Sequence, residues 1–382
     1  MVKSSPTVGV IVGIQYYRHP PEVALYKCPD LEVKFIGSEP KPWYDVGHHE
    51  FVYTPIEKIL PDFISSIFVR KPYGPVSFIR LKKGFEKVLK DIDVINCVEL
   101  YAFISAQCAK FAKKHKKKLA VTVYETIHHM PYYIFPPFSL NTQFVSKQAD
   151  VIIATSNKAV EALHSLSIPQ DKIEMIYPGI DTEKFSAIPL KRNEDRLRIL
   201  YVGRLDPEKG IYYLLEAFAK LSKKRENVEL WLCGIPRTLG VSAIVKSYAN
   251  KYAIHNCGFV SREELPKIYS QCDIFCFPSL DRKKYGLKVW EEQFGFAAVE
   301  AMACGLPIVA TNCGAVPEVV GKENLVVEQK SVDAFCSAFC KLIDDEDFRY
   351  KLGRSNRIRA ENLFNIKRQT SKVQELFFQL SL

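Results

Sequence analysis

The sequence predicts an α/β protein of two domains, each built on a doubly wound parallel sheet. Short apolar runs typical of strands alternate with stretches whose apolar residues recur at helical spacing, and they do so in both halves of the chain. A length of 382 residues suffices for two ordinary domains, and a hydrophobic share of 47% supports substantial cores. A polar stretch at residues 191–196 separates the halves, so we expect domains at 1–190 and 191–382.

The first half opens with a strand, a helix and a second strand at residues 8–13, 20–28 and 31–37. Further strands are predicted at 94–97, 119–124, 151–154 and 173–176, and helices at 101–115 and 157–166. Parallel sheets bind ligands beyond the carboxyl ends of their strands. The side chains of interest are therefore Gly13, Glu99 and those in the loop at 125–130, which includes Glu125, His128 and His129.

The second half repeats this order, with a strand at 198–202, a helix at 211–223 and a strand at 228–233. Its first turn contains Gly203, Arg204 and Lys209. Glycine permits close backbone approach, arginine grips a phosphate with two donors, and lysine supplies a mobile charge. An ordinary charged turn is the alternative. The last stretch, 365–382, is predicted to be an amphipathic helix.

Charge and composition limit the partners. The formal net charge is +10, and residues 51–118 hold 14 Lys or Arg against 6 Asp or Glu. An anionic membrane surface along residues 55–90 would suit this charge, and an ordinary solvated face is the alternative. No recognised nucleic-acid motif accompanies it, so we expect no nucleic-acid partner.

Location and redox state are predicted from the same composition. We find no run of about eighteen apolar residues and no secretory leader, and we expect a cytoplasmic protein, with peripheral membrane binding left open. The eleven cysteines lack paired zinc-type spacing and are expected to be reduced.

The most informative stretch, residues 290–320, reads WEEQFGFAAVEAMACGLPIVATNCGAVPEVV. Seven residues separate Glu292 from Glu300, and a helix begins after Phe294 and Gly295. Backbone N–H groups and the positive dipole end at such a helix start favour a phosphate. A solvated helix with surface glutamates is the alternative explanation.

The ordered pattern Glu-x7-Glu, Phe-Gly, Glu-Ala-Met-Ala-x-Gly-x-Pro and Thr-x-x-Gly-x-x-Pro-Glu resembles the nucleotide-sugar segment of retaining glycosyltransferases of family 4. The resemblance is strong in the second half and weak in the first. It implies a GT-B fold, in which two Rossmann-like domains face a central cleft and the last helix packs back on the first domain. It also implies metal-independent transfer from a UDP- or GDP-sugar to a hydroxyl, with no cofactor.

The resemblance assigns roles to particular residues. The candidate catalytic residues are Glu292, Arg204, Lys209 and His128. The candidate substrate-binding residues are Gly13, Glu125, His129, Phe294, Gly295, Glu300, Gly203, Phe259 and Val260. Arg204 and Lys209 would bind the diphosphate, Glu300 the ribose and Glu292 the donor sugar, while Phe259 and Val260 would lie against the base. Which of the two adjacent histidines faces the donor stays open.

Two departures from the family pattern affect the expectations. The loop at 13–18 lacks the usual glycine pair, and a basic insertion at 282–285 borders the expected sugar site. The acceptor is left open between a lipid, a glycan and a small molecule. The alternatives are a degenerate nucleotide-sugar-binding partner subunit, a phosphorylase or epimerase of the same fold, and a basic nucleic-acid-binding protein.

Overall fold

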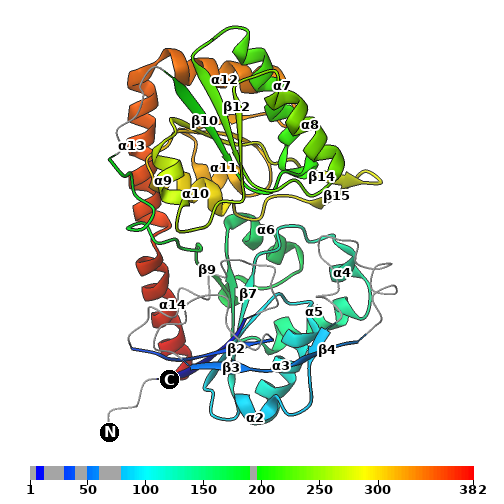
Figure 1. The fold of residues 1–382 in the computed structure, drawn as a ribbon. Helices are drawn as coiled ribbons and strands as arrows, with labels where there is room; N and C mark the ends of the chain where they lie inside the picture. Colours follow the sequence, from blue (N-terminus) through cyan, green and yellow to red (C-terminus); the bar gives the residue numbers. More distant parts are fainter. Residues whose placement is uncertain (1–5, 13–29, 39–49, 60–78, 190–195) are drawn as a thin grey trace. The chain divides into compact units, whose positions relative to one another are not determined.

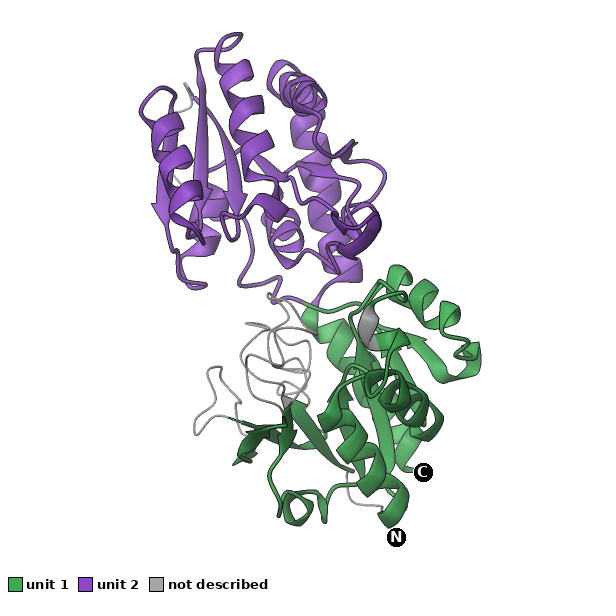
Figure 2. Cartoon of the chain, turned by 90° about the vertical axis from the view of Figure 1, so that its right-hand side faces the viewer, with its two compact units in different colours: residues 1–179, 366–382 green, residues 180–365 purple. Residues whose placement is uncertain are grey.

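The computed structural model describes residues 6–12, 30–38, 50–59, 79–189 and 196–382. The described residues form two compact units, residues 1–179 with 366–382, and residues 180–365 (Figures 1 and 2). The domain boundary was expected near residue 190, next to residues 190–195, which lie outside the described residues. The contacts within the structure instead divide the chain between Gly179 and Ile180. The helix expected at 20–28 and most of the basic segment at 55–90 also lie outside them.

The first unit contains a parallel sheet in the order β3-β2-β1-β6-β7-β8-β9. Its strands are β1 (Thr7–Val12), β2 (Glu32–Gly37), β3 (Glu50–Tyr53), β6 (Val94–Val98), β7 (Lys118–Val123), β8 (Val151–Ala154) and β9 (Ile173–Met175). Its helices are α2 (Glu86–Leu89), α3 (Phe103–His115), α4 (Pro131–Ile134), α5 (Phe138–Gln148), α6 (Asn157–Ser165) and α14 (Ile366–Ser381), with the 3₁₀ turn η3 (Gln170–Lys172). Each strand predicted in this half is confirmed to within two residues.

The second unit contains a parallel sheet in the order β12-β11-β10-β13-β16-β17. Its strands are β10 (Leu197–Val202), β11 (Val228–Cys233), β12 (Ile254–Gly258), β13 (Ile274–Phe277), β16 (Ile308–Thr311) and β17 (Leu325–Val327). Its helices are α7 (Ile211–Ser222), α8 (Leu239–Ala249), α9 (Leu265–Ser270), α10 (Phe296–Ala303), α11 (Val316–Val320), α12 (Val332–Asp344) and α13 (Glu346–Leu363), with the 3₁₀ turn η4 (Pro207–Lys209). Two Rossmann-like units are thereby confirmed.

Helices cover the sheets through apolar faces that the sequence periodicity predicts. One face of the first sheet packs on α3 and α6, while the other packs on α14 through Val373 and Phe377. The C-terminal helix therefore belongs to the core of the first unit. In the second unit α7, α8 and α12 pack on the face formed by residues such as Ile199, Leu230 and Leu232. Burial of these faces is the main stabilising contribution.

Two antiparallel strand pairs were not predicted. One pairs β4 (Ile56–Lys58) with β5 (Ile79–Leu81), and the other pairs β14 (Arg282–Lys284) with β15 (Leu287–Trp290). The β14–β15 pair is a hairpin formed by the basic insertion. Among the described residues no helix is long and apolar enough to cross a membrane. The ten described cysteines are free thiols, and Cys28 lies outside the described residues.

Candidate functional site

The order of strands in the second sheet creates a crevice between two loops. From β10 the chain proceeds to β11 and β12 on one side, and then crosses to β13 on the other. The loops that leave the carboxyl ends of β10 and β13 therefore run in opposite directions. Ligands of doubly wound folds bind at such a switch point. Here the β10 loop carries Arg204 and Lys209, and the β13 loop carries Ser279 and leads to Glu292.

Lys209 and Glu292 meet at this point, although they are 83 positions apart in the sequence. Lys209 Nζ donates to Glu292 Oε2 at 2.5 Å, and Ser279 Oγ donates to the same oxygen at 2.9 Å. The ammonium also lies 4.7 Å from the centre of the Trp290 ring. Both charged side chains are mostly shielded from water, with 16% and 13% of their surface exposed. Shielding strengthens the attraction between them and fixes their positions.

Backbone contacts hold Glu292 in place. Its carbonyl accepts from Ala315 N at 2.8 Å, and its N–H lies 3.4 Å from Cys313 Sγ. Gly314 has a φ of +54°, and a Cβ built there would lie 2.1 Å from the Glu292 carbonyl oxygen. Only glycine allows this close approach. The Thr-x-x-Gly part of the sequence pattern therefore has a structural role, which is to seat the first glutamate.

Arg204 pairs within its own loop. Its guanidinium lies 3.0 Å from Asp206 Oδ2 and 3.6 Å from Glu208 Oε1, and 41% of the side chain is exposed. Burial raises the pKa of Asp206, and the Arg204 charge opposes that rise. Tyr201 OH donates to the Arg204 carbonyl at 2.6 Å. Gly234, which follows β11, allows the chain to approach the Gly203 carbonyl, because a Cβ built on Gly234 would lie 1.7 Å from that oxygen.

Glu300 lies in a separate polar cluster on α10. Tyr269 OH donates to Glu300 Oε2 at 3.1 Å, and Arg262 lies 3.5 Å from Oε1. The side chain is buried, and burial raises its pKa, while the Arg262 charge and the Tyr269 hydrogen bond lower it. The surface-glutamate alternative is therefore wrong for this residue. A buried carboxylate with two fixed donors is suited to accept further hydrogen bonds from hydroxyl groups.

Phe294 and Gly295 lead into α10 as predicted. Gly295 is the N-cap residue with a φ of +99°, and no side chain caps the helix there. Phe294 is buried, with its ring 5.6 Å from that of Phe364. In the loop after β12, Phe259 is 59% exposed and follows Gly258, whose φ is +65°. Val260 is half-buried. More than half of the surface of the Phe259 side chain therefore faces solvent.

The first sheet has its own switch point, between β1 and β6. Glu99 follows β6 with a φ of +63°, and its Oε1 accepts from the N–H groups of Tyr124 and Glu125 at 3.0 and 3.2 Å. Burial, then the charge of Glu125, raises the pKa of Glu99 to about 8. Glu125 is buried as well, with Oε1 accepting from two following N–H groups.

The two histidines share one short loop. The rings of His128 and His129 lie 5.4 Å apart, edge to face, with His128 exposed and His129 half-buried. Their roles stay predictions. Gly13 lies outside the described residues, so its expected contact with the donor is also untested.

We expect Glu99→Gln to reduce the dependence of stability on pH. The carboxyl titrates near 4.5 in an unfolded chain and near 8 when folded, so the folded protein holds a proton that the unfolded chain has lost. Wild-type stability from this group should be present below pH 4.5 and lost as the pH rises through 8. Thermal unfolding across that range should show a smaller decline in Tm for the variant. Glu174→Gln, at an exposed position, is the control, and parallel declines in all three proteins would contradict the assignment.

The structure thus brings Lys209 and Glu292 into contact and places Glu300 and Arg204 in separate clusters of the same unit. Sequence reasoning did not identify Ser279, Trp290, Arg262 or Tyr269 as site residues. Ser279 and Trp290 flank the insertion, and Arg262 follows the 258–261 loop, so their positions beside motifs were the available signal. Tyr269 gave no local signal, because its hydroxyl reaches Glu300 only through tertiary packing.

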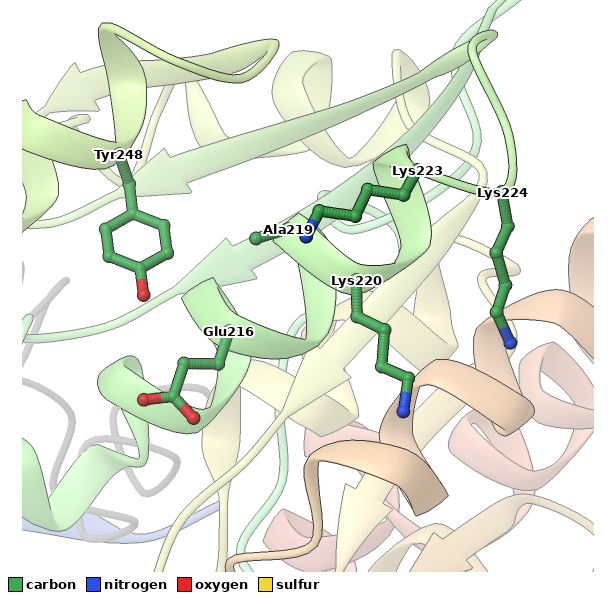
Figure 3. A pocket seen from close by; sticks show the side chains of 6 residues that line it. All are labelled: Glu216, Ala219, Lys220, Lys223, Lys224 and Tyr248. Carbon is green, nitrogen blue, oxygen red and sulfur yellow. The ribbon is translucent and has the colours of Figure 1, made fainter.

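A surface hollow of about 490 Å³ lies elsewhere in the second unit (Figure 3). Its lining comes mainly from the C-terminal half of α7 and from α8: Glu216, Ala219, Lys220, Lys223, Lys224 and Tyr248. Lys209, which belongs to the crevice, comes just before the opposite, N-terminal end of α7. All three lysines are exposed, and Lys220 pairs with Asp333. This hollow is not the site built around Glu292.

Two family models match consecutive parts of the chain. The model described as glycosyl transferases group 1 matches residues 182–359, and the model described as glycosyltransferase family 4 matches residues 43–184. An MMP alpha-(1->4)-mannosyltransferase of Mycolicibacterium hassiacum is 30% identical over 59% of this chain and 54% of its own length. A GDP-mannose-dependent phosphatidylinositol monomannoside mannosyltransferase of Mycobacterium tuberculosis is 29% identical over 54% and 56%. The chain thus spans about half the length of these curated relatives.

Solved structures share the fold across nearly the whole chain. A crystal structure of Anabaena HepE in complex with UDP superposes with a TM-score of 0.71 and 16% identity, over 98% of this chain and 100% of that one. The glycosyltransferase WaaG, involved in lipopolysaccharide biosynthesis, gives a TM-score of 0.67 and 13% identity over 97% and 99%. At such low identity these likenesses establish the GT-B fold and nothing finer.

Proposed function

This chain belongs to the glycosyl transferases of group 1, and from that premise we propose that it moves a sugar from a UDP- or GDP-sugar to a hydroxyl acceptor. The observation that carries the proposal is the shielded Lys209–Glu292 pair at the switch point of the second sheet. A cation at that position stabilises negative charge on a departing diphosphate, and the neighbouring carboxylate accepts hydrogen bonds from sugar hydroxyls.

The chemistry asks for stabilisation of two developing charges. Breaking the C1–O bond leaves negative charge on the diphosphate and positive charge on the sugar ring. Lys209, Arg204 and the N-terminus of α10 supply positive charge or N–H donors toward an anion. A donor diphosphate would draw Lys209 from Glu292 and free that carboxylate for the sugar. Glu300, held by Tyr269 and Arg262, is assigned to the ribose hydroxyls.

Retention of configuration and independence of metal form part of the proposal. Two side-chain cations in the β10 loop support a diphosphate site that needs no divalent ion. The choice between UDP and GDP is left to experiment: HepE was crystallised with UDP, and the mycobacterial relative is named as GDP-mannose-dependent. The acceptor remains a glycan, a lipid-linked sugar or a small molecule. Product configuration, read by NMR of the anomeric proton, tests retention.

We expect a nucleotide of one class to raise the Tm of the wild-type protein in the presence of EDTA and to leave that of Arg204→Ala nearly unchanged. A ligand that binds only the folded state stabilises it by mass action, about 2.7 kcal/mol at one hundred times Kd. The panel is UDP, GDP, ADP, UDP-glucose and GDP-mannose in a thermal-shift assay. Arg354→Ala removes an exposed arginine of the same unit and should retain the full shift.

The outcomes separate the readings. A shift that requires added magnesium would refute metal independence. A nucleotide sugar could raise the Tm and yet release no nucleotide when it is incubated with a panel of acceptors. That result would favour the degenerate partner subunit, which binds the donor without transferring the sugar. No shift with any nucleotide at saturation would refute the donor site itself.

A further inference from the structure

The β14–β15 hairpin extends away from the body of its unit (Figure 1). Its base is anchored beside the candidate site: Leu280 N donates to Glu208 O at 2.9 Å, and Asp281 N donates to Gln329 Oε1 at 2.7 Å. The hairpin leaves the fold just after Ser279 and returns just before Glu292, and both of these side chains belong to the crevice. A partner bound at its tip would therefore sit at a fixed distance from the site.

The tip is basic and apolar at once. Residues 282–287 read Arg-Lys-Lys-Tyr-Gly-Leu, without an acidic side chain. Tyr285 is 90% exposed and Leu287 is 60% exposed, and Lys284 Nζ lies 4.7 Å from the centre of the Tyr285 ring. No ion pair within the described part of the chain involves Arg282, Lys283 or Lys284. Positive charge and apolar surface are thus presented together to the surroundings.

Two local features of the hairpin are unfavourable for the stability of the folded chain. Tyr285 and Gly286 form the two-residue turn with φ of +51° and +80°, where asparagine followed by glycine is the favoured pair. Lys283 lies directly opposite Lys288 across the strands, and like charges in such a pair repel. Lys288 pairs with Asp281 at 2.9 Å and with Glu291 at 2.6 Å, whereas Lys283 has no ion-pair partner of its own among the described residues. Unfavourable choices at exposed positions point to a use outside the chain.

From these contacts we propose that the hairpin tip docks on an anionic lipid surface. A convex two-residue turn does not enclose a small ligand, which requires a concave site. An aromatic ring and a leucine flanked by cations match the composition of interfacial anchors, in which the ring sits at headgroup level and the cations meet lipid charge. A base of a single-stranded nucleic acid could stack on Tyr285, but it would leave Leu287 without an apolar contact.

Docking has a geometric consequence for the site. Arg282 and Tyr285 are three positions apart in extended chain, so the tip lies roughly 10 Å beyond the base of the hairpin. Glu292 would then be held at about that height above the headgroups, within reach of a hydroxyl displayed at a membrane. The docking itself does not depend on sugar transfer, so the two proposals fail separately.

The test is flotation of the full chain with lipid vesicles at low salt. Vesicles of phosphatidylcholine alone are compared with vesicles in which about a third of the lipid is phosphatidylglycerol. We expect binding to the anionic vesicles only, and Lys283→Glu/Lys284→Glu should weaken it by roughly 30-fold or more, which corresponds to about 1 kcal/mol per lost cation. Tyr285→Asn should weaken it several-fold while keeping or raising the Tm, because asparagine tolerates positive φ. That variant separates docking from misfolding.

The matched control is Lys223→Glu/Lys224→Glu at the basic hollow of Figure 3, which reverses the same two charges in the same unit. It should retain most of the vesicle binding. Any of three results in the flotation assay without added nucleic acid would overturn the proposal: no wild-type binding to anionic vesicles, equal binding by the hairpin variants, or loss of binding in the hollow variant alone. A single-stranded oligonucleotide could also displace the protein from the vesicles. If it bound more tightly than the vesicles and its binding required Tyr285, the proposal would be overturned in favour of nucleic acid.

Discussion

Replacing Lys209 with methionine should lower kcat/KM for release of nucleotide from the donor by about 10²–10³-fold, the loss typical of one well-aimed charge-stabilising donor. Methionine keeps an unbranched side chain against Trp290 and removes the charge, so the loss reports electrostatics rather than packing. UDP-glucose and GDP-mannose are the test donors, and the released nucleotide is measured by a coupled assay. Lys267→Met, at an exposed position on α9, should be unaffected.

Variants of Lys209 and Glu292 are expected to affect stability and catalysis in different ways. Without Lys209 the Glu292 carboxylate stays mostly shielded and keeps the Ser279 hydroxyl as its nearest described donor, so Tm should also fall. The double variant Lys209→Met/Glu292→Gln removes both charges and should recover Tm without recovering activity. If activity returned together with Tm, the lysine would have a structural role only, and the charge-stabilising assignment would be wrong.

Replacing Gly314 with alanine should destabilise the second unit by roughly 3 kcal/mol, the sum of a left-handed backbone cost and local overpacking. The added Cβ would lie 2.1 Å from the Glu292 oxygen and 2.9 Å from the Glu292 nitrogen, so the glutamate must move with the loop. For a unit of this size the Tm should fall by roughly 6–12 °C. Any nucleotide-induced shift should shrink at the same time.

Gly286→Ala is the matched control for this prediction. Gly286 also has a positive φ, +80°, but no atom lies within 4 Å of a Cβ built there. Its cost should be limited to the backbone term, about 1 kcal/mol. Equal losses in the two variants would show that the Gly314 contact with Glu292 contributes nothing beyond backbone conformation.

Periodicity in the sequence predicted the core strands and helices well. The runs expected at 94–97, 151–154 and 228–233 correspond to β6, β8 and β11 within one residue, since a strand buried on both faces is apolar throughout. The alternation of strands and helices was sufficient to predict parallel sheets. Short strands with mixed side chains, such as β3 and β14, gave no such signal and were missed.

The sequence by itself predicted two Rossmann-like units, the family resemblance and the residue types of the proposed donor site, because strand and helix patterns and the Glu-x7-Glu motif are local in the chain. The family resemblance already implied that the last helix packs on the first unit, as α14 does. Tertiary structure alone decided that Lys209 meets Glu292, 83 positions further along the chain, and that Arg262 and Tyr269 contact Glu300. These contacts depend on strand order and on helix packing. A local pattern carries no information about which distant segment will be adjacent, so that information appears only when the sheets have formed.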